Sequence, residues 1–192
     1  MPKFCANLTM LFNEFDFMDR FEAAAKADFT GVEYLFPYDY DAADLKAKLD
    51  AFNLTQVLHN LPAGDWAGGE RGIAVLPDRM DEFKAGVDTA INYATTLDCK
   101  QVNCLAGIPT PDVGPAIAQD TFISNLRYAA DKLKAAGIRL LIEPINTRDI
   151  PGFYLTHTQQ AIDIINAVGS DNLFVQYDIY HMQIMEGDVS RG

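Results

Sequence analysis

The sequence predicts an α/β protein built as a (β/α)₈ barrel, of which its 192 residues supply about six of the eight β/α units. Short β-rich runs alternate with segments of helical periodicity, the pattern of a parallel sheet with helical crossovers. No glycine-rich turn follows the first run, although a doubly wound nucleotide-binding sheet would need one there. Polar residues instead gather where the runs end, as they do at the mouth of a barrel.

Six runs rich in β-branched and aromatic residues are expected as strands. They lie at residues 3–11, 31–36, 54–60, 100–107, 138–145 and 172–178. Between most of these runs, apolar residues recur at helical spacing and predict five amphipathic helices. The five apolar stripes are Phe17, Phe21, Ala24 and Ala25; Leu45, Leu49 and Phe52; Phe83, Val87, Ala90, Ile91 and Ala94; Phe122, Leu126, Ala129, Ala130 and Leu133; and Ala161, Ile164, Ile165 and Val168.

Capping residues agree with these helices. Asp16 and Asp41 are expected as N-caps, and Thr156 or Thr158 is expected to start the fifth helix. Glycines that follow a periodic segment are expected to end helices, because glycine adopts the left-handed conformation readily. These glycines are Gly31, Gly137 and Gly169.

The length and composition indicate one domain over residues 1–192. Fifteen Lys and Arg against 27 Asp and Glu give a net charge of −12, which disfavours nucleic-acid binding. No apolar run is long enough for a membrane span, and the amino terminus is interpreted as a first strand rather than a signal peptide. Three cysteines without metal-like spacing are typical of reduced thiols in a cytoplasmic protein.

Polar side chains at the expected strand ends are the candidate functional residues. Barrel geometry would turn all of them toward one mouth, where polar groups are expensive to bury unless they are paired or metal-bound. They are Asn7 and Thr9, Glu33 and Tyr38, His59 and Asn60, Asn103, Glu143 and Asn146, and Asp178 and His181.

Glu143 and Asp178 are expected at neighbouring strand ends, where strands lie about 4.8 Å apart. Two carboxylates that close repel each other unless a cation or proton lies between them, so a divalent metal site is predicted. Oxygen ligands favour Mg²⁺ or Mn²⁺. A Glu143 that pairs with an Arg or Lys at the rim is the structural alternative. The role of His181 stays open: it could be a metal ligand, a substrate contact, a general acid or a surface group.

The long segment 61–79 has no periodicity, and loops of that length are usually functional or disordered. Its sequence "GGERGI" offers Arg71 as a bidentate partner for a substrate carboxylate. Trp66 is a candidate cover for the site. A mobile surface loop with an incidental arginine is the alternative.

The stretches "ANLTMLF", "VEYLFPYDY", "GDWAGGERGI", "LIEPINTRDIPGFY" and "QYDIYHMQIMEGD" closely resemble the hydroxypyruvate isomerase family, a branch of the xylose isomerase-like TIM barrels. The resemblance runs from about residue 3 to the end of the chain. It implies interconversion of hydroxypyruvate and tartronate semialdehyde, a step of glyoxylate metabolism. An enediolate forms and a proton moves between neighbouring carbons. No organic cofactor is expected.

The resemblance also implies residue roles. Glu143 matches the glutamate that ends the fifth strand as an acid/base group and metal ligand, and Asp178 matches a metal ligand. His181 matches a substrate contact in related sugar epimerases. Arg71, His59 and Asn7 are further expected substrate-binding residues. Strands seven and eight, with the second catalytic glutamate, are absent from this sequence, so a truncated chain is expected.

Several alternatives stay open at this point. A 2-oxo-tetronate isomerase or a ketose 3-epimerase would share the same constellation with a different pocket size. A DNA-repair endonuclease of the same fold would need many histidines and a basic face. This sequence has three histidines and a net charge of −12. A non-catalytic truncated remnant is the last alternative. The expected partners are a small oxo acid and further copies of the chain, because unpaired edge strands invite association, with no nucleic acid and no membrane.

Overall fold

The computed structural model describes residues 3–187, in which strands and helices alternate along the chain. The strands are β1 (Cys5–Asn7), β2 (Gly31–Glu33), β3 (Thr55–Asn60), β4 (Gln101–Cys104), β5 (Arg139–Ile142) and β6 (Leu173–Val175). The α-helices are α1 (Arg20–Lys26), α2 (Ala42–Ala51), α3 (Met80–Thr96), α4 (Pro115–Ala135), α5 (Thr158–Val168) and α6 (Ile179–Met185). Two 3₁₀ turns, η1 (Phe17–Asp19) and η2 (Pro77–Arg79), precede α1 and α3.

All neighbouring strands are parallel and lie in chain order, β1-β2-β3-β4-β5-β6. A doubly wound sheet reverses its strand order partway, whereas a barrel adds each new strand beside the previous one. The order therefore confirms the barrel prediction over its alternative. Strands seven and eight, and the glutamate expected on the eighth, lie outside the described residues.

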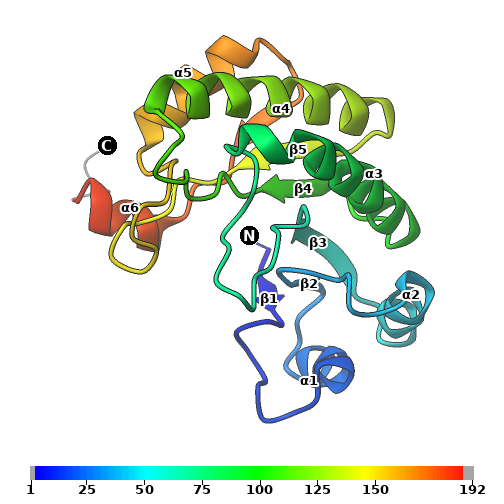
Figure 1. Cartoon of the computed structure of the whole chain (residues 1–192). Helices are drawn as coiled ribbons and strands as arrows, with labels where there is room; N and C mark the ends of the chain where they lie inside the picture. Colours follow the sequence, from blue (N-terminus) through cyan, green and yellow to red (C-terminus); the bar gives the residue numbers. More distant parts are fainter. Residues whose placement is uncertain (1–2, 188–192) are drawn as a thin grey trace.

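Helices α1 to α5 lie on the outer side of the curved sheet, with α3 and α4 next to each other over β4 and β5 (Figure 1). The predicted stripes supply most of their buried residues, for example Phe83 and Val87 in α3 and Leu126 in α4. Ile91 and Ile165, also in those stripes, are only half-buried. Within residues 3–187, no helix has both the length and the apolar character that crossing a bilayer requires.

Most predicted helix ends are confirmed. Asp41 caps α2 by accepting a hydrogen bond from the backbone N–H of Ala43, and α5 begins at Thr158. Gly169 ends α5 in the left-handed conformation, with φ 72°. Asp16 precedes the turn η1 but its side chain makes no capping hydrogen bond.

The prediction that Gly31 ends a helix is wrong. Helix α1 ends before Ala27, and Asp28 provides the left-handed residue with φ 62°. Gly31 is instead the first residue of β2, where an added Cβ would lie 3.0 Å from Cγ2 of Val57. Close packing between strands, rather than helix termination, explains glycine at this position.

The long segment 61–79 is packed against the end of β4. The backbone N–H of Leu61 donates to the carbonyl of Asn103 at 2.8 Å, and that of Val75 donates to the carbonyl of Ala106 at 3.1 Å. Ile73, Val75 and their neighbours are buried. These contacts identify a docked loop rather than a mobile surface segment.

Candidate active site

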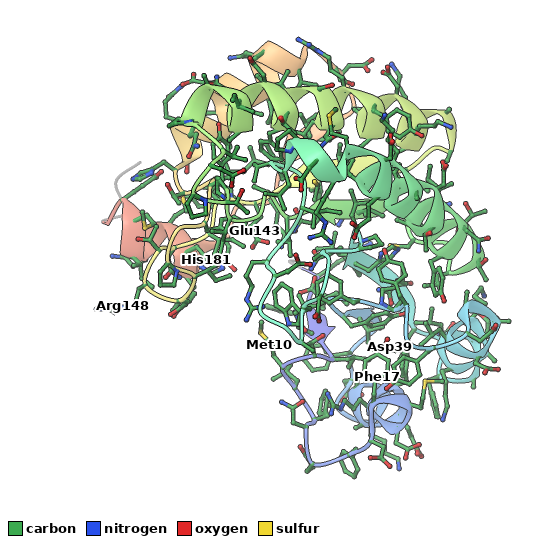
Figure 2. The ribbon with its side chains drawn as sticks, in the orientation of Figure 1. Met10, Phe17, Asp39, Glu143, Arg148 and His181 are labelled. Atoms are coloured by element: carbon green, nitrogen blue, oxygen red, sulfur yellow. The ribbon has the colours of Figure 1, made fainter. Side chains whose placement is uncertain are left out.

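A cavity of about 400 Å³ lies at the carboxyl ends of the strands. The loops after β3 and β5 and the short helix α6 lie around this end of the sheet (Figure 1). Glu143 and His181 lie near each other there, while Arg148 lies farther out on its loop (Figure 2). Polar lining residues come from or follow both outer strands and strands between them: Asn7, Glu33, Tyr34, His59, Asn60, Glu143, Asp149, Gln176, Asp178 and His181.

Glu143 follows β5 directly and is only 8% exposed. Its carboxylate accepts a hydrogen bond from the side-chain amide of Asn103 at 3.1 Å. Burial, reinforced by the charges of Asp178 and Glu33, raises the pKa of Glu143 to about 8, against the lowering effect of its hydrogen bonds. A carboxyl group that titrates near neutrality can both take and return a proton, as acid/base catalysis requires.

Asp178 ends the run after β6 and caps α6. Its Oδ1 accepts hydrogen bonds from the backbone N–H groups of Tyr180 at 2.7 Å and His181 at 3.3 Å. Its other oxygen, Oδ2, lies 3.9 Å from Nε2 of His181. One carboxylate oxygen therefore holds the helix in place, while the second is left for the cavity.

The predicted pair of carboxylates is brought together. Single ligand atoms of Glu143, Asp178 and His181 all lie within 4.8 Å of one another. Two carboxylates at this spacing, one with a pKa raised by the other's charge, are stabilised by a cation between them. The oxygen donors fit Mg²⁺ or Mn²⁺, so the residues present fit a divalent cation.

His181 lies between the metal-ligand candidates and the loop after β5. Its Nδ1 lies 2.7 Å from Nδ2 of Asn146, a fully buried side chain. Nε2 is the ring nitrogen nearer Asp178. The structure disfavours the surface-group alternative for His181, because the protein holds the ring at the cavity wall.

His59 and Asn60 end β3 and are almost completely buried. Nδ1 of His59 lies 3.1 Å from the backbone carbonyl oxygen of Asn60. Burial lowers the pKa of His59 to about 4, so the ring is neutral at physiological pH. The structure places His59 on the cavity, and its substrate contact stays a prediction.

Asn7 and Glu33 form the opposite wall. The Asn7 amide donates to Glu33 at 3.0 Å, and its oxygen accepts the backbone N–H of Thr9 at 3.0 Å. Burial raises the pKa of Glu33 above its ordinary value, with a smaller contribution from Asp178. Sequence reasoning placed Glu33 at a strand end without assigning it a role. The strand-end rule that led to Glu143 also applies to Glu33 and could have found it.

Arg71 is not among the cavity-lining residues. Its guanidinium donates to the backbone carbonyls of Trp66 at 3.1 Å and Glu70 at 2.7 Å, and lies 4.4 Å from the centroid of the Trp66 ring. Trp66 itself lines the cavity. The structure thus places the tryptophan on the cavity, as predicted for a cover, and the arginine as its support.

Comparison with known proteins agrees with the fold. Residues 21–191 match the family described as xylose isomerase-like TIM barrel. The chain belongs to this family. It is 55% identical over 190 residues to hydroxypyruvate isomerase of Escherichia coli (strain K12), which covers 99% of this chain and 74% of that protein. It is 47% identical to 2-oxo-tetronate isomerase of Cupriavidus necator, and the match covers 99% of this chain and 73% of that protein.

Solved structures share the architecture. A structure from Brucella melitensis described as an AP endonuclease of family 2 has 49% sequence identity and a TM-score of 0.96, and covers 100% of this chain and 74% of that one. D-psicose 3-epimerase from Clostridium cellulolyticum H10 has 20% identity and a TM-score of 0.79, covering 99% and 68%. The second likeness concerns the fold alone.

Proposed function

We propose that this protein is an isomerase that interconverts hydroxypyruvate and 2-hydroxy-3-oxopropanoate by enediolate proton transfer. The observation that carries the proposal is the buried carboxyl of Glu143, with a pKa near 8, on the cavity beside Asp178. Proton abstraction beside a carbonyl needs such a base and a positive group near the oxygens. The 55% identity to a hydroxypyruvate isomerase supports the choice of substrate.

Glu143 removes the proton from the carbon beside the substrate carbonyl. Asn103 orients its carboxylate by the hydrogen bond to Oε2, and burial keeps the group basic enough to accept a proton. The family resemblance assigns proton transfer at the neighbouring carbon to a second glutamate, which lies outside the described residues. Trp66 covers part of the cavity and limits the access of water to the intermediate.

Glu143 and Asp178 are the residues that would hold a divalent cation. Such a cation, when bound, stabilises negative charge on the substrate oxygens. The chain's own contribution is geometric: Asp178 is fixed by its cap on α6, and Glu143 by Asn103. A homo-oligomeric state and a cytoplasmic location stay predictions.

Steady-state kinetics tests the proposal. We expect turnover of hydroxypyruvate in the presence of Mg²⁺ or Mn²⁺, and a loss of about 10³-fold or more in kcat for Glu143→Gln, in the range seen when an acid/base group is removed. Glu14→Gln, the same chemical change on an exposed residue, is the matched control and should turn over normally. Unchanged turnover in Glu143→Gln, with the fold intact, would contradict the assignment of Glu143 as the acid/base group.

A four-carbon substrate is the second candidate. The relatives named 2-oxo-tetronate isomerase reach 47% identity, and a cavity of about 400 Å³ has room for one more carbon. Comparing kcat/KM for hydroxypyruvate and a four-carbon 2-oxo acid decides between them. A higher value for the longer acid would reverse the order of the two candidates.

DNA cleavage is disfavoured despite the description of the Brucella structure. The chain carries a net charge of −12 and three histidines. An acidic surface repels the phosphate backbone, and zinc sites of nucleases rely on imidazole ligands. Cleavage of abasic DNA with added Zn²⁺ would contradict this reasoning.

A further inference from the structure

Two of the three histidines, His59 and His181, line the cavity, and the protein engages one ring nitrogen of each. A neutral imidazole carries its proton on one nitrogen and accepts a hydrogen bond on the other. The group that meets the engaged nitrogen therefore decides whether the remaining nitrogen donates or accepts.

At His181 the protein supplies donors. Oδ1 of Asn146 accepts the backbone N–H groups of Arg148 and Asp149 at 3.0 and 2.9 Å, which fixes the orientation of the amide. Its Nδ2 must then donate to Nδ1 of His181 at 2.7 Å, and the backbone N–H of Asn146 also points to Nδ1 at 3.4 Å. Because Nδ1 accepts, Nε2 carries the proton and is a donor.

At His59 the protein supplies an acceptor. The backbone carbonyl of Asn60 lies 3.1 Å from Nδ1 and can only accept, so Nδ1 carries the proton. The Tyr38 hydroxyl lies 3.4 Å from Nδ1 but gives its own hydrogen to the same carbonyl at 2.6 Å. Nε2 of His59 therefore presents a lone pair.

That lone pair has no hydrogen-bond partner among residues 3–187, although the atom is buried. His59 is 1% exposed. Buried polar atoms without a partner are uncommon in folded proteins and often have a functional explanation. A substrate hydroxyl in the cavity would satisfy it.

We propose that the cavity orients its substrate through two histidines held in opposite tautomers, His59 accepting from a substrate hydroxyl and His181 donating to a substrate oxo or carboxylate oxygen. Asn146 is the positioning residue that sets the tautomer of His181. The inference rests on the proposed function, because a hydroxylated oxo acid offers one group of each kind. Among residues 3–187 it also leaves the metal-binding role of this cluster to Glu143 and Asp178, since a protonated Nε2 does not bind a metal.

Long-range ¹H–¹⁵N NMR of the ligand-free protein, with ¹⁵N-labelled histidine rings, tests the tautomers without any need for activity. We expect the Nδ1–H form for His59 and the Nε2–H form for His181. His157 is exposed, and its Nδ1 lies 2.9 Å from the Thr156 hydroxyl, which can donate or accept, so His157 serves as the internal reference for a ring whose tautomer the protein does not fix. An Nε2–H form at His59 or an Nδ1–H form at His181 overturns the proposal.

Asn146→Asp replaces the donor to His181 by an acceptor of the same shape, and it also removes the hydrogen bond that Nδ2 donates to Oδ2 of Asp149 at 2.9 Å. We expect His181 to change to the Nδ1–H form, with kcat/KM lower by about 10- to 100-fold, the range for groups that orient a site histidine. Asn13→Asp adds the same charge at an exposed position and should change neither the tautomer of His181 nor kcat/KM. If Asn146→Asp unfolds, Asn146→Ala should give His181 a mixture of tautomers. A His181 ring that stays in the Nε2–H form in every folded variant overturns the role of Asn146.

Ligand titration tests the substrate contacts. Excess hydroxypyruvate should shift the Nε2 resonance of His59 toward the protonated range, whereas pyruvate, which lacks the hydroxyl, should leave it unchanged. Equal effects of the two acids, or no effect at His59, overturn the assigned contact. Correct tautomers in a protein that does not isomerise hydroxypyruvate would reject the proposed function alone. Reversed tautomers in an active isomerase would reject this inference alone.

Discussion

The side-chain amide of Asn103 donates to the carboxylate of Glu143 across 3.1 Å, from the middle of β4 to the residue that follows β5. The same amide nitrogen donates to Oδ1 of Asn60 at 3.1 Å. Asn103 is fully buried, so it shields the carboxylate from water while stabilising its ionised form. The basicity of Glu143 therefore depends on a neighbouring strand.

Replacing Asn103 by Leu should raise the pKa of Glu143 further, because a hydrogen bond that favours the ionised form is lost. A hydrogen bond to a charged group contributes about 1.5 kcal/mol or more, which corresponds to about one pH unit. The rising limb of kcat/KM against pH should move upward by that amount. Asn125→Leu removes a buried amide outside the cavity, where Asn125 donates to the carbonyl of Ala74, and should leave the limb in place. Coinciding pH profiles for Asn103→Leu and the wild type would contradict the assigned role.

Glu143→Gln should stabilise the metal-free protein at pH 9 and have little effect on its stability near pH 4. Below pH 4.5 the carboxyl is protonated in the folded and unfolded states alike. Between pH 4.5 and about 8 only the unfolded state releases the proton, so the wild type loses stability as pH rises. The loss is on the order of 5 kcal/mol at most, and glutamine avoids it. Urea unfolding with a chelator present, at pH 4, 7 and 9, measures the difference. A difference that does not change with pH would contradict the raised pKa.

Binding of Mn²⁺ at pH 7 should release a proton, because the carboxyl of Glu143, with a pKa of about 8, is mostly protonated in the metal-free protein. Calorimetry in two buffers with different ionisation enthalpies measures the proton count. Asp178→Asn should weaken binding by at least tenfold, or ~1.4 kcal/mol, while the fold is kept because asparagine also caps helices well. Binding without proton release, or equal affinity in Asp178→Asn, would remove these two residues from the metal site.

Gly72→Ala should displace the segment 61–79 from the end of β4. Gly72 has φ +121°, and an added Cβ would lie 2.5 Å from the backbone carbonyl oxygen of Leu105. Gly69 has φ +103° but open space around the same position, so Gly69→Ala carries only the backbone strain. We expect Gly72→Ala to be less stable than Gly69→Ala by about 2 kcal/mol, in the range for such clashes and strain. Urea unfolding measures both, and equal stabilities would show that the loop adapts.

The sequence alone predicted the architecture, because periodicity reports which residues are buried and strand–helix alternation restricts the sheet to parallel crossovers. The predicted strands were longer than the paired ones: residues 3–11 were expected where β1 spans Cys5–Asn7. Apolar, strand-forming residues continue past the assigned end of the strand because they remain buried, as Leu8 does. Glu143 and Asp178 were also predicted together, since consecutive strands of a barrel are neighbours.

The tertiary structure decided what each site residue presents to the cavity. Arg71 was expected there, yet the loop carbonyls and the ring of Trp66 hold it away from the cavity wall. The tautomers of His59 and His181 depend on groups that approach the rings in space, among them Asn146, which lies 35 residues before His181. Strand order follows from local periodicity, but the direction of a side chain at a barrel rim follows from contacts between loops distant in sequence. Only the folded chain brings those contacts together.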